Sequence, residues 1–408
     1  MMRTPFLLLF IILVSCKSEI KKTNETHLSK NDKGIHQLST PSLNNSSLPK
    51  LYSNGEDLYM SWVEKQDTVS ILKYSFFKNN NWSIPYDITS GTDWFVNWAD
   101  YPAIAENNGN ILTNILQKSA SGTYTYDVKL NLYSKENKSW KNNFLLHLDG
   151  TQSEHGFVSI LPYKKDSFFV TWLDGRTTVG VPKGDEQMTI RGAVINNKGE
   201  IEQDILLDDR VCDCCNTSST MTSNGPVVVY RDRSQEEIRD ISMVRWENGQ
   251  WTQPQIVAED NWHIPGCPVN GPEIDALGSN IAMTWFTAEN DNPRVQVVFS
   301  DDSGKTFGLP YRIDKGNAIG RVDVAMINEN TAAVLWMEPQ GVDTVIQLVK
   351  VSVDGKINDP ITVSKTRSER ASGFPQLEIV GDKVYIAWTS MENENPKIKM
   401  AVVEIKSL

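Results

Sequence analysis

Aromatic residues recur at a nearly constant interval along this chain, and each of them ends a short apolar strand. Five of these positions, spaced roughly every 50 to 60 residues, are Trp172, Tyr230, Trp285, Trp336 and Trp388. Trp62 ends a similar strand two intervals before Trp172, and residues 111–117 supply the unit between them. A repeat of this length made only of strands is typical of a β-propeller blade. We therefore predict an all-β fold with its blades arranged around one axis.

The number of blades follows from the two ends of the repeat. Seven units can be counted, but the chain stops after the third strand of the last one. Residues 35–40 resemble the fourth strands of other units, such as residues 86–89 and 361–364. We therefore predict seven four-stranded blades closed by an N-terminal strand, which leaves no open edge in the ring. Six blades are the alternative if the irregular second unit is not a blade.

The N-terminus has the pattern of a leader sequence. Arg3 precedes an unbroken apolar run over residues 6–14, which is too short to span a bilayer. Residues 13–16 (Leu-Val-Ser-Cys) resemble the bacterial lipobox, which implies lipidation of Cys16. We predict a signal peptide over 1–15, the lipidated cysteine and a flexible tether over 16–33, and a single propeller over 34–408. An ordinary secretory signal with an incidental cysteine is the alternative.

Charge and location limit the partners. The formal net charge is −11, which makes nucleic acid a poor partner. We expect a monomer held on the membrane through its lipid anchor alone, at the periplasmic or outer surface of a bacterial cell envelope. No cofactor is certain from the sequence. The expected ligand is a glycan or another envelope component.

One turn carries a family resemblance. Residues 300–307 read Ser-Asp-Asp-Ser-Gly-Lys-Thr-Phe. The residues that match the pattern S-x-D-x-G-x-T-F/W are Ser300, Asp302, Gly304, Thr306 and Phe307. The segment is similar to the Asp-box of sialidases and other BNR-repeat propellers. This resemblance implies a structural turn in a propeller, of which the sialidase type has six blades, and it says little about the reaction.

Chemistry-bearing residues gather in two kinds of connection. The links from strand D of one blade to strand A of the next lie on the same face as the loops from strand B to strand C, because strand direction alternates. The D–A links contain Asp100, Glu154, His155, Cys212, Cys214, Cys215, His263, Cys267, Asn270 and Arg321. The B–C loops contain Asp174, Arg176, Arg231, Asp232, Arg233, Glu236, Glu237 and Arg239. His147 is taken to lie outside this set. We predict the functional site on this face.

The arginines suit an anionic ligand, because guanidinium groups bind carboxylates bidentately. The predicted ligand-binding residues are Arg176, Arg231, Arg233, Arg321, His155 and Asn270. The resemblance to sialidases implies an arginine triad, an Asp proton donor and a Tyr–Glu pair. This chain departs from that pattern, since residues 4–170 contain no Arg and no Tyr–Glu pair can be assigned. The alternative is that Arg231-Asp232-Arg233 and Arg239-Asp240 form ion pairs that brace a long loop.

The cysteines permit two interpretations. Cys212, Cys214, Cys215 and Cys267 could form disulfides that join two neighbouring links, as an oxidising compartment favours. Alternatively, their thiolates and His263 could bind copper or zinc, although the spacing fits no standard zinc motif. The sequence favours disulfides and leaves the metal open.

These observations lead to two functional hypotheses. The first is a sialidase-like envelope lipoprotein that binds a glycan and, if two carboxylates flank the sugar, hydrolyses it. The candidate carboxylates are Asp174, Glu154 and Asp232. The second is a non-catalytic propeller whose Cys/His cluster binds metal or docks another protein.

Overall fold

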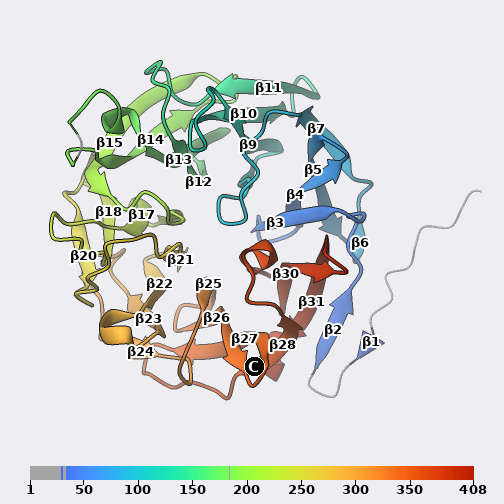
Figure 1. Ribbon diagram of the computed structural model, residues 1–408. Helices are drawn as coiled ribbons and strands as arrows, with labels where there is room; N and C mark the ends of the chain where they lie inside the picture. The colour runs from blue at the N-terminus through green and yellow to red at the C-terminus, as the bar shows by residue number, and fades with distance from the viewer. Residues whose placement is uncertain (1–28, 31–33, 183) are drawn as a thin grey trace, which may run out of the picture.

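Seven antiparallel sheets surround one axis in the computed structural model, which describes residues 29–30, 34–182 and 184–408 (Figure 1). The first strands of neighbouring sheets contact one another all the way round, so the ring is closed. The predicted all-β propeller with seven blades is confirmed, and the six-bladed alternative is wrong.

Each blade has four main strands, which we call A to D outward from the axis. Blades 1 and 2 consist of β3 (Ser46–Ser53), β4 (Leu58–Gln66), β5 (Val69–Lys78), β7 (Tyr86–Gly91), and β8 (Ile104–Asn107), β9 (Asn110–Lys118), β10 (Tyr126–Ser134), β11 (Ser139–Leu145). Blades 3 and 4 consist of β12 (His155–Tyr163), β13 (Ser167–Asp174), β14 (Met188–Ile195), β15 (Ile201–Val211), and β16 (Ser218–Thr222), β17 (Gly225–Arg231), β18 (Ile241–Glu247), β20 (Gln255–Ala258).

The remaining blades follow the same order. Blades 5 and 6 consist of β21 (Glu273–Leu277), β22 (Asn280–Thr287), β23 (Arg294–Ser300), β24 (Tyr311–Arg312), and β25 (Gly320–Asn328), β26 (Thr331–Gln340), β27 (Asp343–Ser352), β28 (Ile361–Thr366). Blade 7 consists of β29 (Gln376–Val380), β30 (Lys383–Glu392), β31 (Asn395–Glu404) and β2 (Ile35–Leu38). The short elements are β1 (Ser29–Lys30), β6 (Asn81–Trp82), β19 (Gln250–Trp251), η1 (Arg176–Thr178), η2 (Glu289–Asp291), η3 (Arg370–Ser372) and η4 (Ile405–Ser407).

The predicted N-terminal strand closes the ring. β2 lies antiparallel beside β31, with Ile35 opposite Val403 and Leu38 opposite Met400 (Figure 1). Ile35 and Leu38 are buried in the blade, and this pairing covers the outer edge of β31. The ends of the chain therefore complete blade 7 together, as the sequence predicts.

The predicted leader and anchor cannot be compared with the structure. Residues 1–15 and Cys16 lie outside the described residues, as does most of the tether over 16–33. In the part of the chain that the structure describes, no helix is both long and apolar enough to cross a membrane.

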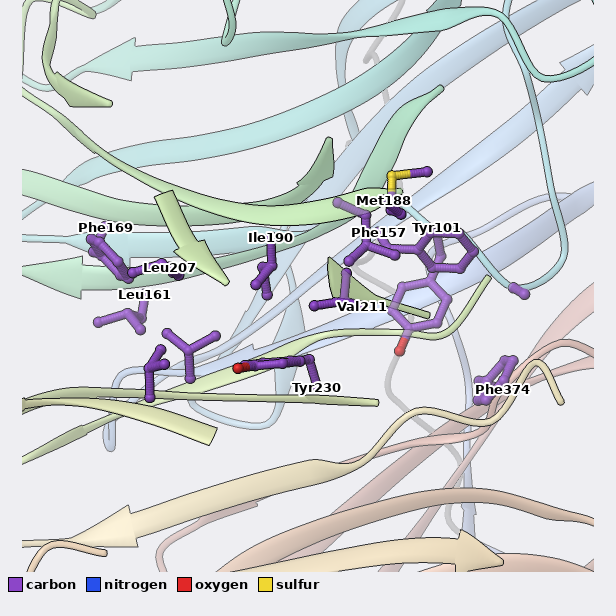
Figure 2. Close-up of a cluster of buried hydrophobic side chains, with 14 of the residues drawn as sticks. Tyr101, Phe157, Leu161, Phe169, Met188, Ile190, Leu207, Val211, Tyr230 and Phe374 are labelled. Carbon is purple, nitrogen blue, oxygen red and sulfur yellow. The ribbon is translucent and has the colours of Figure 1, made fainter. Parts of the chain in front are cut away.

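The recurring aromatic residues pack between blades, which explains their period. Trp172 lies in a buried cluster with side chains of blade 2, and Trp285 lies in one with side chains of blade 4. Tyr230 does the same against blade 3, where Figure 2 shows it near Ile190 and Val211. Each aromatic thus buries its ring against the preceding blade, so blades are stable only as neighbours.

The turn at residues 300–307 joins strands C and D of blade 5. The carboxylate of Asp302 accepts hydrogen bonds from the backbone N–H of Thr306 at 2.9 Å and from its hydroxyl at 2.7 Å. Gly304 has a φ of 80°, which favours glycine, and Phe307 packs against the core. These contacts give the segment the structural role that its sequence implies.

Candidate functional site

The cysteine-bearing link and the arginine-bearing loop lie side by side. The link between blades 3 and 4 (residues 212–217) begins where the N–H of Cys212 donates to the C=O of Arg231 at 3.0 Å. Val211 and Asp232 form an isolated bridge at the same place. The B–C loop of blade 4 therefore borders this link on the face where the sequence places the site.

All four described cysteines are free thiols, so the predicted disulfides are not formed. The Sγ of Cys212 lies 3.5 Å from that of Cys215 and 3.7 Å from that of Cys214. Cys267, from the next link, lies with Cys214 and Asp213 in a second close group. His263 is exposed and belongs to neither group, so the structure does not bring it to the sulfur atoms.

Two of the predicted ligand-binding arginines are committed to the backbone. Arg231 is 1% exposed and donates to the carbonyl oxygens of Asn270, Arg239 and Phe286 at 2.6–2.9 Å. Arg321 is also buried, and its guanidinium donates to the carbonyls of residues 368, 369 and 373. Both hold loops together and leave no free face for a ligand.

Asn270 joins these two arginines. Its backbone oxygen accepts from Arg231, and its side-chain oxygen accepts from the N–H of Arg321 at 2.7 Å. Its side-chain nitrogen donates to the carbonyls of Pro268 and Ile319. Asn270 thus braces the links on both sides of blade 5, and the structure gives it no atom to spare for a ligand.

Arg233 and Arg239 form the ion pairs that the sequence left as an alternative, but with a different partner. Both guanidiniums contact Glu237, at 2.6 Å and 2.8 Å. Asp240 instead accepts the N–H groups of residues 261 and 262, and Asp232 accepts the N–H of Arg233. Glu237 is therefore the residue that braces this loop.

Asp232 lies half-buried at the start of the same loop. Burial, together with the charges of Asp208 and Asp240, raises its pKa to about 6, although the N–H of Arg233 acts in the other direction. The hydroxyl of Ser242 is its side-chain donor. Asp232 therefore lies between blades 3 and 4, close to a carboxyl group of each.

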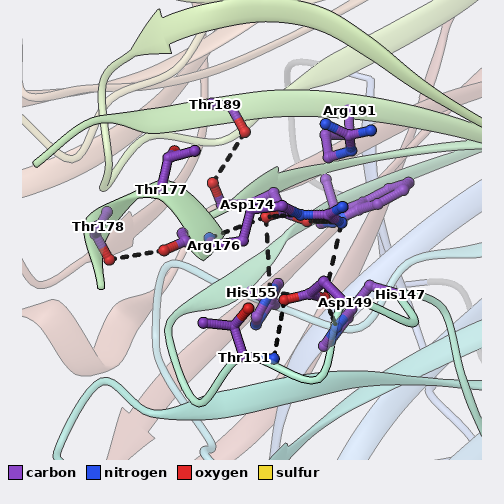
Figure 3. A network of polar contacts seen from close by, with 12 residues as sticks. His147, Asp149, Thr151, His155, Asp174, Arg176, Thr177, Thr178, Thr189 and Arg191 are labelled. Atoms are coloured by element: carbon purple, nitrogen blue, oxygen red, sulfur yellow. Dashed lines mark hydrogen bonds and ion pairs between the residues drawn. The ribbon is translucent and has the colours of Figure 1, made fainter. Parts of the chain in front are cut away.

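Asp174 lies in a closed polar network at the end of β13 (Figure 3). It is 0% exposed, and its oxygens accept hydrogen bonds from the indole N–H of Trp172 at 2.7 Å and from Arg176 at 2.7 and 2.8 Å. Blade 6 repeats the arrangement, since Trp336 donates to Glu338 two residues later. Asp174 and Arg176 therefore stabilise the blade, and neither Asp174 oxygen is free to reach a sugar.

The network also contains two stacked histidines. The rings of His147 and His155 are 3.6 Å apart and within 8° of parallel. His147 contacts Asp149 at 2.8 Å, and Nε2 of His155 lies 3.6 Å from Asp149 and 3.7 Å from Asp174. His147 follows β11 and so lies in the D–A link itself, which corrects the sequence interpretation that set it apart.

This pair predicts a pH-dependent stability. Burial and His155 lower the pKa of His147, while Asp149 and Asp127 act against them. At His147 the unfolded chain therefore takes up a proton near pH 6.5 that the folded protein binds only at lower pH, so the contribution of His147 to stability falls as the pH drops below about 6.5. His147→Asn, which keeps a side-chain N–H but does not titrate, should show a smaller fall, by at most about 1.4 kcal/mol per pH unit. Urea unfolding of the wild-type protein and of His147→Asn between pH 7 and 5.5 measures how the free energy of unfolding changes with pH. Equal slopes in the two proteins would contradict the prediction.

Glu154 is the predicted carboxylate that combines partial exposure with a hydrogen bond from a tyrosine hydroxyl. It is half-buried in the link before β12, and the hydroxyl of Tyr126 donates to its Oε1 at 2.7 Å. Burial raises the pKa of Glu154 to about 7, and the charge of Asp213 raises it while Tyr126 lowers it. Close to neutral pH this carboxyl can therefore both give and take a proton.

The contact also supplies a Tyr–Glu pair that the sequence interpretation missed. Tyr126 begins β10 in blade 2, and Glu154 ends the link to blade 3, so the two are distant in sequence. Their positions in the repeat are the signal that could have paired them, because the start of a C strand and the start of the next A strand lie on one face. Asp100 lies beside them, accepts the N–H of Phe157 at 2.9 Å, and has a pKa that burial raises to about 8.

Aromatic side chains border this pair. Phe95 stacks on Tyr126 with ring centroids 4.3 Å apart, and the exposed Tyr124 meets the edge of Phe95 at 6.0 Å. The same link carries Trp98, which stacks on Phe374 from the link before blade 7. The segment from Phe95 to Trp98 thus contacts the Tyr126–Glu154 pair at one end and the link before blade 7 at the other.

A small polar cavity lies beside this group. It has a volume of about 70 Å³ and is lined by Lys50, Asp100, Glu273 and residues of β12 and β16. Lys50 and Glu273 belong to A strands, which line the axis. A space of this size and polarity has room for water molecules and not for a sugar.

Comparisons with known proteins bear on the fold. No protein-family model matches the chain, and no curated protein sequence matches it. Among solved structures, a protein of unknown function from Dyadobacter fermentans matches with a TM-score of 0.52 and 11% identity, over 94% of this chain and 99% of that one. At this identity the likeness shows the propeller fold alone.

Glycan-processing propellers are also found among the structural neighbours. The NanB sialidase from Streptococcus pneumoniae has a TM-score of 0.47 and 13% identity, over 96% of this chain and 72% of that one. An α-L-arabinofuranosidase from Fusarium graminearum has a TM-score of 0.49 and 11% identity, over 89% and 94%. These similarities are weaker than the first.

Proposed function

We propose that the face formed by the D–A links and B–C loops binds a glycan, and that Glu154 transfers a proton during its cleavage. The observation that carries this proposal is the half-buried Glu154 carboxyl held by the Tyr126 hydroxyl, beside the partly buried ring of Phe95 and the exposed ring of Tyr124. A carboxyl with a pKa of about 7 is protonated in a large fraction of molecules at neutral pH, so it can act as a general acid.

The surrounding side chains suit a sugar. Aromatic rings such as the exposed Tyr124 offer flat apolar surfaces against which the C–H face of a pyranose or furanose can stack. Arg370 lies exposed near Trp98 and, among the described residues, forms no ion pair with a carboxylate. A free guanidinium at this position favours a sugar that carries a carboxylate or sulfate.

A hydrolytic reaction needs a second carboxylate. Asp213 is the candidate, because it is half-exposed in the neighbouring link and its charge acts on Glu154. Asp174 is enclosed by Trp172 and Arg176 and cannot take this role. The apolar leader and Cys16 support placing the domain on a lipid anchor in the cell envelope.

The test combines substrate screening with two variants. Hydrolysis of 4-methylumbelliferyl sialoside, arabinofuranoside and glucuronide identifies a substrate, and Glu154→Gln should then lower kcat/KM roughly 10²–10⁴-fold. Glu200→Gln, the same change in an exposed turn on the opposite face, should leave kcat/KM unchanged. Tyr126→Phe should move the alkaline limb of the pH profile to higher pH, because the hydroxyl lowers the pKa of Glu154.

Two outcomes would contradict the proposal. One is an unchanged rate for Glu154→Gln on a glycoside that the wild-type protein cleaves. The other is no turnover of any of the three glycosides together with no retention of the protein on a glycan array.

A further inference from the structure

Three sulfur atoms lie together in the link between β15 and β16. Cys212, Cys214 and Cys215 come from one short segment, and their Sγ atoms all lie within 4.8 Å of one another. Cys212 and Cys215 are each 1% exposed, whereas Cys214 reaches toward the surface. The glycan proposal assigns no role to this cluster.

The separations of the sulfur atoms match those of metal ligands. A disulfide bond joins sulfur atoms at about 2.05 Å, and the structure has 3.5 Å and 3.7 Å instead. Thiolates at about 2.3 Å from a tetrahedral metal lie about 3.8 Å apart. The two distances from Cys212 are close to this edge length, so the three Sγ atoms form a triangle above which one ion can sit.

A positively charged side chain lies beside the sulfur atoms. Nη1 of Arg239 lies 3.1 Å from Sγ of Cys212, and this guanidinium is itself held by Glu237. A guanidinium at this distance can balance the negative charge that thiolate ligands bring to the cluster.

The cluster of Cys212, Cys214 and Cys215 can be reached from solvent on one side. Cys267 is exposed, and its Sγ lies 3.8 Å from Oδ1 of Asp213. These two groups and the Sγ of Cys214 lie within 4.8 Å of one another. A metal ion arriving from solvent therefore meets Cys267 and Asp213 before it reaches the buried sulfur atoms.

We propose that Cys212, Cys214 and Cys215 bind a single thiophilic d¹⁰ metal ion, Cu(I) or Zn(II). The soft sulfur set selects these ions over Mg²⁺ or Ca²⁺, and binding releases the remaining thiol protons to solvent. Cu(I) is satisfied by three sulfur ligands, whereas Zn(II) takes a fourth ligand from solvent or a carboxylate. The bound ion would fix the link between blades 3 and 4 beside Arg239 whether or not the face cleaves glycans.

The experiment titrates the reduced protein anaerobically with each metal. Cu(I) is added in competition with bicinchoninate and Zn(II) in competition with a chromophoric chelator, and X-ray absorption then counts the ligands. We expect one ion per chain, with sulfur neighbours at about 2.3 Å. Three sulfur atoms alone identify the copper form, and three sulfur atoms with one oxygen identify the zinc form.

Serine variants locate the ligands. Cys212→Ser and Cys215→Ser should each weaken binding at least roughly tenfold, and Cys267→Ser, the matched change at the entrance, should keep the stoichiometry. Near-UV circular dichroism establishes that each variant is folded. The proposal is overturned if neither metal binds to the folded reduced protein, if Cys267→Ser loses the ion as fully as Cys215→Ser, or if the protein isolated without reductant has lost the mass of four hydrogens, as two disulfides require.

Discussion

Lys50→Met is expected to lower the free energy of unfolding by about 3 kcal/mol at pH 8 and by much less at pH 5. Lys50 lies on β3 facing the axis, where carboxyl groups of three other A strands surround it. They are Glu273 on β21, Asp323 on β25 and Glu378 on β29. Burial opposes the charge of Lys50, but Tyr101 and these carboxyl groups raise its pKa, so it stays a cation.

The pH dependence follows from the carboxyl groups. Burial raises the pKa of Glu273 to about 7 and that of Asp323 to about 6, and Lys50 lowers both. The folded protein therefore holds protons on these two groups that the unfolded chain releases near pH 4, so their contribution to stability falls as the pH rises from about 4 to 7. Without Lys50 both pKa values rise further, and the fall becomes larger. At pH 5 the groups are neutral in either protein, and the difference is small.

Urea unfolding at pH 5, 6.5 and 8 measures this effect. Lys365→Met, the same change at an exposed residue paired with Asp343, is the matched control and should change little at any pH. A loss of stability in Lys50→Met that is equal at pH 5 and pH 8 would show that Lys50 acts through packing and not through the carboxyl groups.

Arg231→Met should cost about 3–5 kcal/mol, because it removes a buried cation whose partners cannot reach water. The guanidinium joins the link before β21, the loop before β18 and the end of β22 through the carbonyls of Asn270, Arg239 and Phe286. It also lies 5.0 Å from the centre of the Trp262 ring. Methionine fills similar space and leaves these carbonyl oxygens without donors.

Two further variants make this prediction specific. Arg367→Met alters an exposed arginine and should leave the free energy of unfolding almost unchanged. Arg231→Lys keeps the charge but loses the planar set of donors, so its stability should lie between those of the wild type and Arg231→Met. If Arg231→Met were as stable as Arg367→Met in urea, the guanidinium would not be holding the blade 4–5 loops.

Some of the site could be predicted from the sequence and some could not. The gathering of the cysteine link and the arginine loop on one face follows from strand direction, and the structure places Cys212 next to Arg231. The chemical roles of these residues could not be derived from the sequence. Arg231 and Asp174 have the residue types of a ligand clamp and a catalytic acid, yet their atoms are taken by carbonyls and by Trp172. Residue type alone does not reveal which hydrogen-bond partners a loop provides.

The architecture could be predicted from the sequence alone. Aromatic residues at a fixed period must each be buried against a neighbouring blade, and a last unit that lacks one strand must take it from the N-terminus. Two contacts could be found only in the tertiary structure. Tyr126 donates a hydrogen bond to Glu154, and the cysteine sulfur atoms lie at the spacing of metal ligands without being joined in disulfides. Blade packing follows from a local pattern that repeats along the sequence. The contacts of Tyr126 with Glu154 and of the cysteines with one another instead involve irregular links, because the conformation of such a link depends on several blades at once.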